Sequence, residues 1–258
     1  MTDSNWNVFA PSALSGRRAL VTGAGQGVGE RLAVALAAAG ASVTVNDIAL
    51  DRAEKVASQI GGSANAASCD VTDLASVQEM FDAGGPWDIV VNNAGNAGAS
   101  ARLGLTPFAQ SDPASWAAPI DVNLRGVMNV TFAALPGMVA QQWGRLITIV
   151  SDAGRFGDAG LAAYAGAKAG AAGFVRSIAR ENGRHGICVN AVALGSISAG
   201  DRDPRDAETI AKQVRAYPIR RLGTPEDVAG IVVLLASDAS AWITGQTIPV
   251  NGGYSSAL

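Results

Sequence analysis

The chain has 258 residues, of which 48% are hydrophobic and 16% charged, and its formal net charge is -3. This composition is typical of a compact globular protein and leaves no broad basic surface for a nucleic acid. No apolar run approaches the ~20 residues that cross a bilayer, and the first residues do not resemble a signal peptide. The two cysteines, Cys69 and Cys188, lack the spacing of a metal site and are expected to be buried thiols in a reducing cytoplasm.

Segments with strand and helix character alternate along the whole chain. Apolar runs bounded by turn residues predict seven strands, at residues 18–22, 42–46, a short strand ending at 69–70, 87–91, 146–150, 187–192 and 246–250. Helix-forming runs predict helices at residues 30–39, 51–60, 73–82, 114–141, 161–180 and 225–237. Gly40 favours an end to the first helix, Thr72 a cap for the third, and Thr224 with Pro225 a start for the last. The alternation predicts an α/β fold with one doubly wound, Rossmann-type parallel sheet of seven strands and helices on both faces.

The chain is expected to form one domain over residues 16–258, preceded by a leader at residues 1–15. No repeat, low-complexity stretch or linker divides it. Residues 195–217 follow a looser pattern of glycine, serine and charged residues, with a weak amphipathic piece near 207–215. We expect this segment to be a flap beside the substrate.

A glycine cluster, T-G-A-G-Q-G-V-G at residues 22–29, lies between the first predicted strand and the first predicted helix. A backbone without side chains can approach a diphosphate closely, and a helix N-terminus favours negative charge. The cluster therefore predicts a nucleotide cradle, although it does not spell G-x-G-x-x-G. The alternative is a tight turn that serves packing alone.

Asp47 ends the second predicted strand, 18 residues after Gly29 (47 minus 29). This is close to the ~20-residue offset at which a carboxylate meets a ribose 2′-hydroxyl, and a carboxylate would repel a 2′-phosphate. Positions 46–48 hold no basic residue and Gln26 occupies the turn, so NAD is favoured over NADP. The alternative for Asp47 is a turn-forming role. Asp70, at the end of the third strand, is expected either to accept from an adenine amine or to cap the next helix.

Residues 151–168 read S-D-A-G-R-F-G-D-A-G-L-A-A-Y-A-G-A-K. Tyr164 and Lys168 stand four apart on a predicted helix, so both side chains leave the same face. Ser151 ends a predicted buried strand, where open α/β sheets place their ligands. A tyrosine titrates near ~10, so the nearby lysine cation is expected to favour its phenolate and make it a usable base.

These motifs, in this order and spacing, resemble the short-chain dehydrogenase/reductase family over nearly the whole chain. The cues are T-G-x-x-x-G-x-G at 22–29, Asp70, N-N-A-G at 92–95, Asn123, Ser151, Y-x-x-x-K at 164–168, Gly245-Gln246 and Gly252-Gly253. The resemblance implies that Tyr164 is the general acid/base and that Ser151 polarises the substrate oxygen. It also implies that Lys168 binds the nicotinamide ribose and lowers the phenol pKa of Tyr164. Asn123 would then hold the water of a proton relay. The cofactor contacts that it implies are Gly23, Gln26, Gly27, Val28, Gly29, Asp47, Asp70, Val71, Asn93, Ala94, Gly95, Tyr164, Lys168 and Ile197.

The chain departs from the family pattern after the strand at 187–192. Where the family usually has P-G followed by a threonine, this sequence has L-G-S-I-S-A at 194–199. Backbone contacts from Ile197 to the nicotinamide amide are expected to survive, whereas the hydroxyl contact depends on Ser198. The single histidine, His185, is expected in a surface turn, and Trp116, Trp143 and Trp242 are expected in the core or at subunit contacts.

The expected substrate cleft is built from residues 96–108, 152–161 and 196–217. The run S-D-A-G-R-F-G resembles members that oxidise ring hydroxyls on alicyclic acyl-CoA compounds. An anionic tail of such a compound is expected to meet arginines of the cleft, at positions 155, 202 and 205. Solvation in exposed loops is the alternative for these arginines.

The sequence thus predicts a cytoplasmic, NAD-dependent oxidoreductase that transfers hydride between nicotinamide and a secondary alcohol or its ketone. One alternative is a 3-oxoacyl thioester reductase that uses NADPH, which Asp47 opposes. Another is a protein that senses the NAD/NADH ratio without turnover, which would need the glycine cradle but no proton relay. The resemblance also implies a homotetramer, with subunit contacts at residues 114–141 and 160–183 and at the final strand. No metal and no membrane or nucleic-acid partner is expected.

Overall fold

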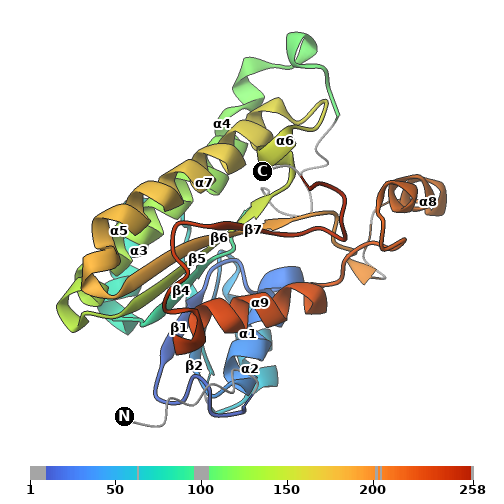
Figure 1. Ribbon diagram of the computed structural model, residues 1–258. Helices are drawn as coiled ribbons and strands as arrows, with labels where there is room; N and C mark the ends of the chain where they lie inside the picture. The colour runs from blue at the N-terminus through green and yellow to red at the C-terminus, as the bar shows by residue number, and fades with distance from the viewer. Residues whose placement is uncertain (1–9, 63, 96–104, 201–202, 204, 257–258) are drawn as a thin grey trace.

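The computed structural model describes residues 10–62, 64–95, 105–200, 203 and 205–256. Seven parallel strands form one sheet in the order β3-β2-β1-β4-β5-β6-β7, which confirms the predicted doubly wound topology (Figure 1). The strands are β1 (Arg18–Val21), β2 (Ser42–Asp47), β3 (Ala64–Ser68), β4 (Ile89–Asn92), β5 (Gly144–Ser151), β6 (Ile187–Leu194) and β7 (Thr247–Val250).

Helices cover both faces of the sheet. The α-helices are α1 (Gly27–Ala38), α2 (Leu50–Ile60), α3 (Leu74–Gly84), α4 (Ala117–Ile120), α5 (Gly126–Gln141), α6 (Ala153–Phe156), α7 (Ala162–Asn182), α8 (Ala207–Ala216) and α9 (Pro225–Ala236). In Figure 1, α1, α2 and α9 lie on one side of the sheet, and α3, α5 and α7 lie on the other. Each side buries its own apolar core because successive side chains of a strand point to opposite faces. In β1, for example, Val21 joins one core and Leu20 the other.

The helix predicted at residues 114–141 is interrupted. A 3₁₀ turn at Pro113–Ser115 and the short helix α4 are followed by a π-helical turn at Asp121–Arg125, and only then by α5. Pro119 lacks the N–H that a regular helix would use, and its carbonyl accepts a 2.8 Å hydrogen bond from Asn123 Nδ2. The π-helical turn therefore aims a buried amide inward at a point where the sequence predicted continuous helix.

Several local predictions are confirmed and one is wrong. Thr224 and Asp227 form a capping box at the start of α9, with Pro225 at its first position. The cap of α3 is Asp73, whose side chain accepts from Ala75 N, and not Thr72. Asp73 is the cap because it is the residue with extended backbone directly before the helix, where its carboxylate can accept from the first helical N–H groups.

Packing of the domain begins before residue 16. Leu14, in the expected leader, is buried in the core and its N–H donates to Ala39 O at 2.8 Å. Cys69 and Cys188 are both buried free thiols, as predicted. Among the described residues, no helix has the length and apolar character needed to cross a membrane.

Candidate active site

The glycine turn joins β1 to α1 and lies against the end of β4. A Cβ at Gly23 would come within 2.8 Å of Ala94 Cα, and one at Gly29 would collide with Asn93 Nδ2 and Gly23 O. Gly27 differs, because no heavy atom outside its own neighbours in the chain and helix lies within 4 Å of the position that its Cβ would take, and its φ is +62°. Packing therefore explains Gly23 and Gly29, whereas the open space at Gly27 fits a ligand that approaches the backbone.

Gln26 and Val28 flank Gly27 at the start of α1. Gln26 is the N-cap residue of this helix, but its side chain makes no capping hydrogen bond. Val28 is partly buried against the apolar core. The 12-residue helix thus begins at the open glycine, and its N-terminal partial charge favours an anion there.

Thr22 joins the glycine turn to the N-N-A-G segment. Its hydroxyl oxygen accepts hydrogen bonds from Asn93 N at 3.1 Å and Ala94 N at 3.0 Å. In return, Asn93 Nδ2 donates to Thr22 O at 2.9 Å and to Gly23 O at 3.0 Å. Thr22 belongs to the quoted glycine motif but was not predicted as a site residue, and the structure shows that it holds the ends of two strands together.

Replacing Thr22 with valine is expected to lower the free energy of unfolding by roughly 2 kcal/mol, because two backbone N–H groups lose their acceptor while the side-chain shape is kept. Urea denaturation measures this loss. Thr22→Ser retains the hydroxyl and should keep most of the stability. If Thr22→Val were as stable as the wild type, the hydroxyl would not hold the two segments together.

Asp47 lies at the end of β2 beside the glycine turn. Its Oδ2 accepts from Gly25 N at 3.1 Å, and its Oδ1 accepts from Ala49 N at 3.0 Å. Oδ1 also pairs with Arg52 Nη2 at 2.7 Å. The sequence predicted the carboxylate at this place. It did not indicate the partner of that carboxylate, Arg52, which lies on α2.

Asp70 and Val71 follow β3. Asp70 Oδ1 accepts from the backbone N–H and the hydroxyl of Thr72, at 2.9 and 2.8 Å. The carbonyl of Val71 accepts from Asn129 Nδ2 at 2.9 Å, and its side chain fills the space beside Gly126. The Asp70 carboxylate thus shapes its own turn and does not cap α3.

The four residues predicted as catalytic come together at the carboxyl ends of β4 and β5. The Ser151 side chain, at the end of β5, is hydrogen-bonded to the Tyr164 hydroxyl. Lys168 lies one turn further along α7, with its Nζ 5.9 Å from the centroid of the Tyr164 ring. A Cβ at Gly95 would lie 2.8 Å from Asn123 Oδ1 and 2.9 Å from Lys168 Nζ, so a side chain at this position would have to displace those two groups.

Burial dominates the protonation of the tyrosine and the lysine. The pKa of Tyr164 lies above its ordinary value, mainly because burial disfavours the phenolate; Asp158 raises it further and the Ser151 hydrogen bond lowers it. Burial lowers the pKa of Lys168 from 10.5 to about 8, and its Nζ donates to Ile149 O at 2.8 Å. In this structure the hydrogen bond from Ser151 lowers the phenol pKa, and the lowering by Lys168 that the family resemblance implies stays a prediction.

A buried polar network anchors the residue next to Ser151. Asp152 Oδ1 pairs with Arg155 Nη1 at 2.8 Å, and its Oδ2 accepts from Asn251 Nδ2 at 2.5 Å and from the Ser255 hydroxyl at 3.0 Å. Asn251 and Ser255 come from the segment after β7. The C-terminal segment is thus attached beside the site, a contact that the sequence did not indicate because nearly 100 residues separate the partners.

The described part of the predicted flap contains α8, where the weak amphipathic pattern lies. Ile197 pairs with Gly223, and Ser198 N donates to Gly223 O at 2.8 Å. The Ser198 hydroxyl accepts from Gly200 N at 3.1 Å, which gives it a turn-forming contact. Arg205 donates to Ile197 O at 3.1 Å and forms an ion pair with Asp203.

The arginines expected to meet an anionic tail are engaged within the chain. Arg155 pairs with Asp152, and Arg205 pairs with Asp203 and donates to Gln213 Oε1 at 2.8 Å. Arg202 lies outside the described residues, as does most of the predicted cleft segment 96–108. The described part of the site therefore lends no support to an acyl-CoA tail. It also holds no group of three or more His, Cys, Asp or Glu side chains that could bind a metal ion.

Comparison with known proteins decides the family. Residues 23–255 match the family described as enoyl-(acyl carrier protein) reductase. The chain is also 39% identical over 251 residues to a 3-oxoacyl-[acyl-carrier-protein] reductase of Synechocystis sp., covering 94% of this chain and 98% of that protein. The chain belongs to the short-chain dehydrogenase/reductase family.

Two solved short-chain dehydrogenase/reductase structures illustrate the range of cofactors among similar folds. A gluconate 5-dehydrogenase from Burkholderia cenocepacia, in complex with NADP and tartrate, has a TM-score of 0.87 and 33% identity, covering 96% of this chain and 98% of its own. A 3-oxoacyl-[acyl-carrier protein] reductase from Brucella melitensis with bound NAD has a TM-score of 0.87 and 33% identity, covering 95% and 94%. Similar members of the family thus hold either nicotinamide cofactor.

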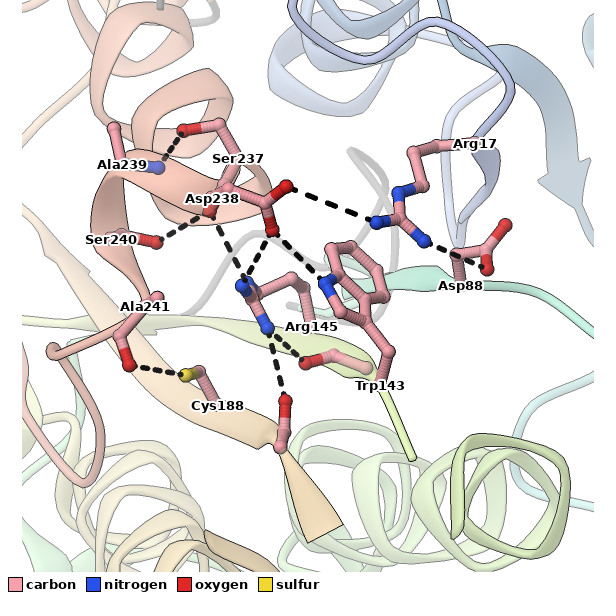
Figure 2. Close-up of polar contacts among 12 residues, drawn as sticks. Arg17, Asp88, Trp143, Arg145, Cys188, Ser237, Asp238, Ala239, Ser240 and Ala241 are labelled. Atoms are coloured by element: carbon pink, nitrogen blue, oxygen red, sulfur yellow. Dashed lines mark hydrogen bonds and ion pairs between the residues drawn. The ribbon is translucent and has the colours of Figure 1, made fainter. Parts of the chain in front are cut away.

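This short-chain dehydrogenase/reductase also has a second polar cluster, near the start of β5 (Figure 2). Figure 2 shows Arg145 beside Trp143 and Asp238; its guanidinium carbon lies 4.3 Å from the Trp143 ring centroid and its Nη2 pairs with Asp238 at 3.2 Å. Arg17 lies 3.6 Å from the centroid of the same ring. Carbonyl oxygens accept the other hydrogen bonds of Arg145, at Gly144, Gly186 and Ser237.

This cluster borders a hollow of about 460 Å³, larger than the one of about 340 Å³ beside Ile197. The larger hollow lies near the start of β5, at the opposite end of the strand from Ser151. We assign the cluster to packing, because the Arg145 guanidinium is buried and is satisfied by backbone carbonyl oxygens and by Asp238. The prediction that Trp143 is a packing residue is confirmed.

Proposed function

We propose that this protein transfers hydride between a nicotinamide dinucleotide and a secondary alcohol or its ketone, with NAD preferred. The observation that carries the proposal is the hydrogen bond between Ser151 and Tyr164, with buried Lys168 one turn away. A hydroxyl, a phenol and an amine thus meet at the carboxyl edge of the sheet, next to a backbone cradle. Membership of an oxidoreductase family supports the same chemistry.

The residues at the glycine turn fit the cofactor. Gly27 leaves open space over the start of α1, where a diphosphate would meet backbone N–H groups. The segment between this turn and Lys168 consists of Asn93, Ala94 and Gly95. We propose that Lys168 binds the nicotinamide ribose. When bound, the cofactor supplies or accepts the hydride, and the protein supplies position and a proton.

In the proposed mechanism, Tyr164 exchanges a proton with the substrate oxygen. Ser151 already shares a hydrogen bond with the phenol, so a substrate oxygen placed between the two would be polarised by one hydroxyl and protonated by the other. Asn123 faces Gly95 and Lys168 from the π-helical turn, and we propose that it holds the water that carries the proton onward. Oxidation of an alcohol reverses each proton movement.

The cofactor preference rests on Asp47. Its carboxylate stands at the end of β2 beside Gly25, where it can accept from ribose hydroxyls. We assign Ile197 a backbone contact to the nicotinamide amide, and Asp70 and Val71 a place near the adenine. These assignments follow the family pattern at the corresponding positions.

A second function is favoured by the relatives. The Synechocystis relative is a 3-oxoacyl-[acyl-carrier-protein] reductase, and so is the Brucella structure. A 3-oxoacyl thioester presents a ketone to the same three groups, so the described active site accommodates either substrate. Arg155 and Arg205 are both paired within the chain, so we assign neither of them to the carrier of such a thioester.

We further propose a homotetramer in the cytoplasm. Met128 and Phe132 on α5 are 44% and 61% exposed, and Trp242, shortly before β7, is fully exposed. These apolar side chains lie on or beside elements that the family resemblance assigns to subunit contacts, and a second copy would cover them. A light-scattering mass equal to one chain would contradict the tetramer. The two free buried thiols support a reducing compartment.

The test of the function is a spectrophotometric screen of reduced nicotinamide, with both cofactors. The panel holds alicyclic alcohols, their CoA thioesters, steroids and 3-oxoacyl thioesters. We expect NAD-dependent oxidation of secondary alcohols. Reduction of 3-oxoacyl thioesters alone, with NADPH, would favour the second function. If NADH bound but no substrate turned over, and Tyr164→Phe left binding unchanged, the protein would instead be a sensor of the NAD/NADH ratio.

A further inference from the structure

Asp152, which follows Ser151 at the end of β5, has a buried carboxylate whose partners come from two segments of the chain. Its side chain is only 3% exposed. Oδ1 accepts from Arg155 on α6, and Oδ2 accepts from Asn251 and from the Ser255 hydroxyl, both after β7. Apolar side chains of similar volume often give the same stability as a buried ion pair, because burying the charges costs desolvation. Stability alone therefore does not account for this carboxylate.

The contact between Asp152 and Asn251 spans the carboxyl ends of three neighbouring strands, β5, β6 and β7 (Figure 1). The backbone N–H of Asp152 donates to the carbonyl of Leu194, the last residue of β6, at 3.0 Å. Asn251 packs on the residue after β6, because a Cβ at Gly195 would come within 3.0 Å of Asn251 Cα. Gly195 leads to Ile197, to which we assigned the contact with the nicotinamide amide. The carboxylate thus joins the end of β5 to the segment expected beside the nicotinamide.

The turn that begins at Asp152 also contacts two groups proposed for catalysis. Ala153 N donates to the Ser151 hydroxyl oxygen at 3.2 Å. A Cβ at Gly154 would come within 3.0 Å of Lys168 Cβ, so the turn packs directly on the part of α7 that holds this lysine. A shift of the turn would therefore move Ser151 relative to Lys168.

We propose that Asp152 is a positioning residue: by holding Asn251, it fixes the Ser151 hydroxyl, and with it the substrate oxygen, relative to the nicotinamide during hydride transfer. This inference rests on the proposed function. The carboxylate is engaged within the chain, so Asp152 acts through Ser151 and not by contact with the substrate. A misplacement of reacting groups by about 1 Å can slow a reaction about 10²-fold. Nucleotide binding depends on the glycine turn, which Asp152 does not hold, and should change little.

The test is the rate of hydride transfer in a single turnover. The complex of protein and NADH is mixed with a saturating concentration of the ketone found in the screen, and the absorbance of NADH is followed by stopped flow. NADH that carries deuterium on the transferring carbon identifies the observed step as hydride transfer through its isotope effect. A separate titration measures the affinity for NADH.

Two single substitutions break the contact, and their combination restores it. Asp152→Asn turns one acceptor into a donor, and Asn251→Asp brings two carboxylates together. The double variant exchanges the two groups, so an amide again donates to a carboxylate. Each single variant should slow hydride transfer by about tenfold or more and keep the affinity for NADH within about twofold of the wild type. The double variant should return to within about threefold of the wild-type rate.

Asp238→Asn is the matched control, because it breaks an ion pair with buried Arg145 at the opposite end of β5. It is expected to lower the melting temperature while keeping the wild-type rate. If thermal unfolding shows that Asp152→Asn does not fold, Ser255→Ala carries the comparison. That variant removes one of the three donors to the carboxylate and should slow hydride transfer by about threefold or more.

Four results would overturn the inference while leaving the proposed function intact. They are a wild-type rate in Asp152→Asn or, in its place, in Ser255→Ala; an equal loss of rate in Asp238→Asn; a double variant as slow as the single variants; and a loss of NADH affinity in Asp152→Asn as large as its loss of rate. Failure of the proposed function would look different, because the wild type would then transfer no hydride to any ketone.

Discussion

Tyr164→Phe is expected to lower kcat/KM by about 10²- to 10⁴-fold while leaving the affinity for NADH close to that of the wild type. The substitution removes one hydroxyl from a buried ring and retains its packing. It takes away the proposed proton donor together with its hydrogen bond to Ser151. Steady-state kinetics with the substrate found in the screen, together with nucleotide titration, measure both effects.

Tyr254→Phe is the matched control, because it removes the hydroxyl of another of the three tyrosines without touching Ser151. Tyr254 stacks on Tyr217 at a centroid distance of 4.9 Å and lies 5.2 Å from the Phe156 ring. This control should keep most of the activity. If Tyr164→Phe and Tyr254→Phe were equally active, Tyr164 would not be the general acid/base.

Lys168→Met is expected to change how stability depends on pH. In the folded protein the pKa of Lys168 is lowered to about 8 from its ordinary 10.5. Between these two values the unfolded chain holds the proton and the folded protein does not, so stability rises with pH across that window. The unfolding free energy of the wild type minus that of Lys168→Met should therefore increase by about 3 kcal/mol from pH 7 to pH 10.5.

Urea denaturation at several pH values measures this difference, in which the other titrating groups cancel. Lys55→Met, an exposed position on α2, is the control and should give a difference that stays flat with pH. A flat difference for Lys168→Met would mean that its ammonium is solvated in the folded protein. In that case, a loss of activity in Lys168→Met would be due to the lost contacts of the side chain and not to the loss of a desolvated amine.

Much of the fold follows from local patterns. Buried parallel strands read as apolar runs, and glycines or caps mark the helix ends, so each of the seven strands was predicted within a few residues. Because all these strands run parallel, the residues that follow them meet at one edge, which brings Ser151 near the N-N-A-G segment. The meeting of Ser151, Tyr164 and Lys168 was predictable from this edge together with the four-residue spacing of Tyr164 and Lys168 on one helix.

The remaining features depend on tertiary contacts that no local pattern reports. The π-helical turn holding Asn123 lies inside a run of helix-forming residues, and its Asn123 side chain bonds back to the carbonyl of Pro119. Arg52 reaches Asp47 only because α2 folds back over the end of β2. Burial, which raises the pKa of Tyr164 and lowers that of Lys168, is a property of the packed core. The four-residue spacing of Tyr164 and Lys168 indicated only that the lysine cation would attract the tyrosine phenolate.

Transfer of deuterium tests the central claim most directly. The protein is incubated with NAD and a secondary alcohol that carries deuterium on its carbinol carbon, and the reduced cofactor is analysed by mass spectrometry. The account predicts that the wild type yields NADH containing one deuterium and that Tyr164→Phe yields almost none while still binding NADH. If the wild type bound NADH but transferred no deuterium from any alcohol in the panel, and no hydride to any ketone in the reverse direction, the proposed hydride transfer would be contradicted.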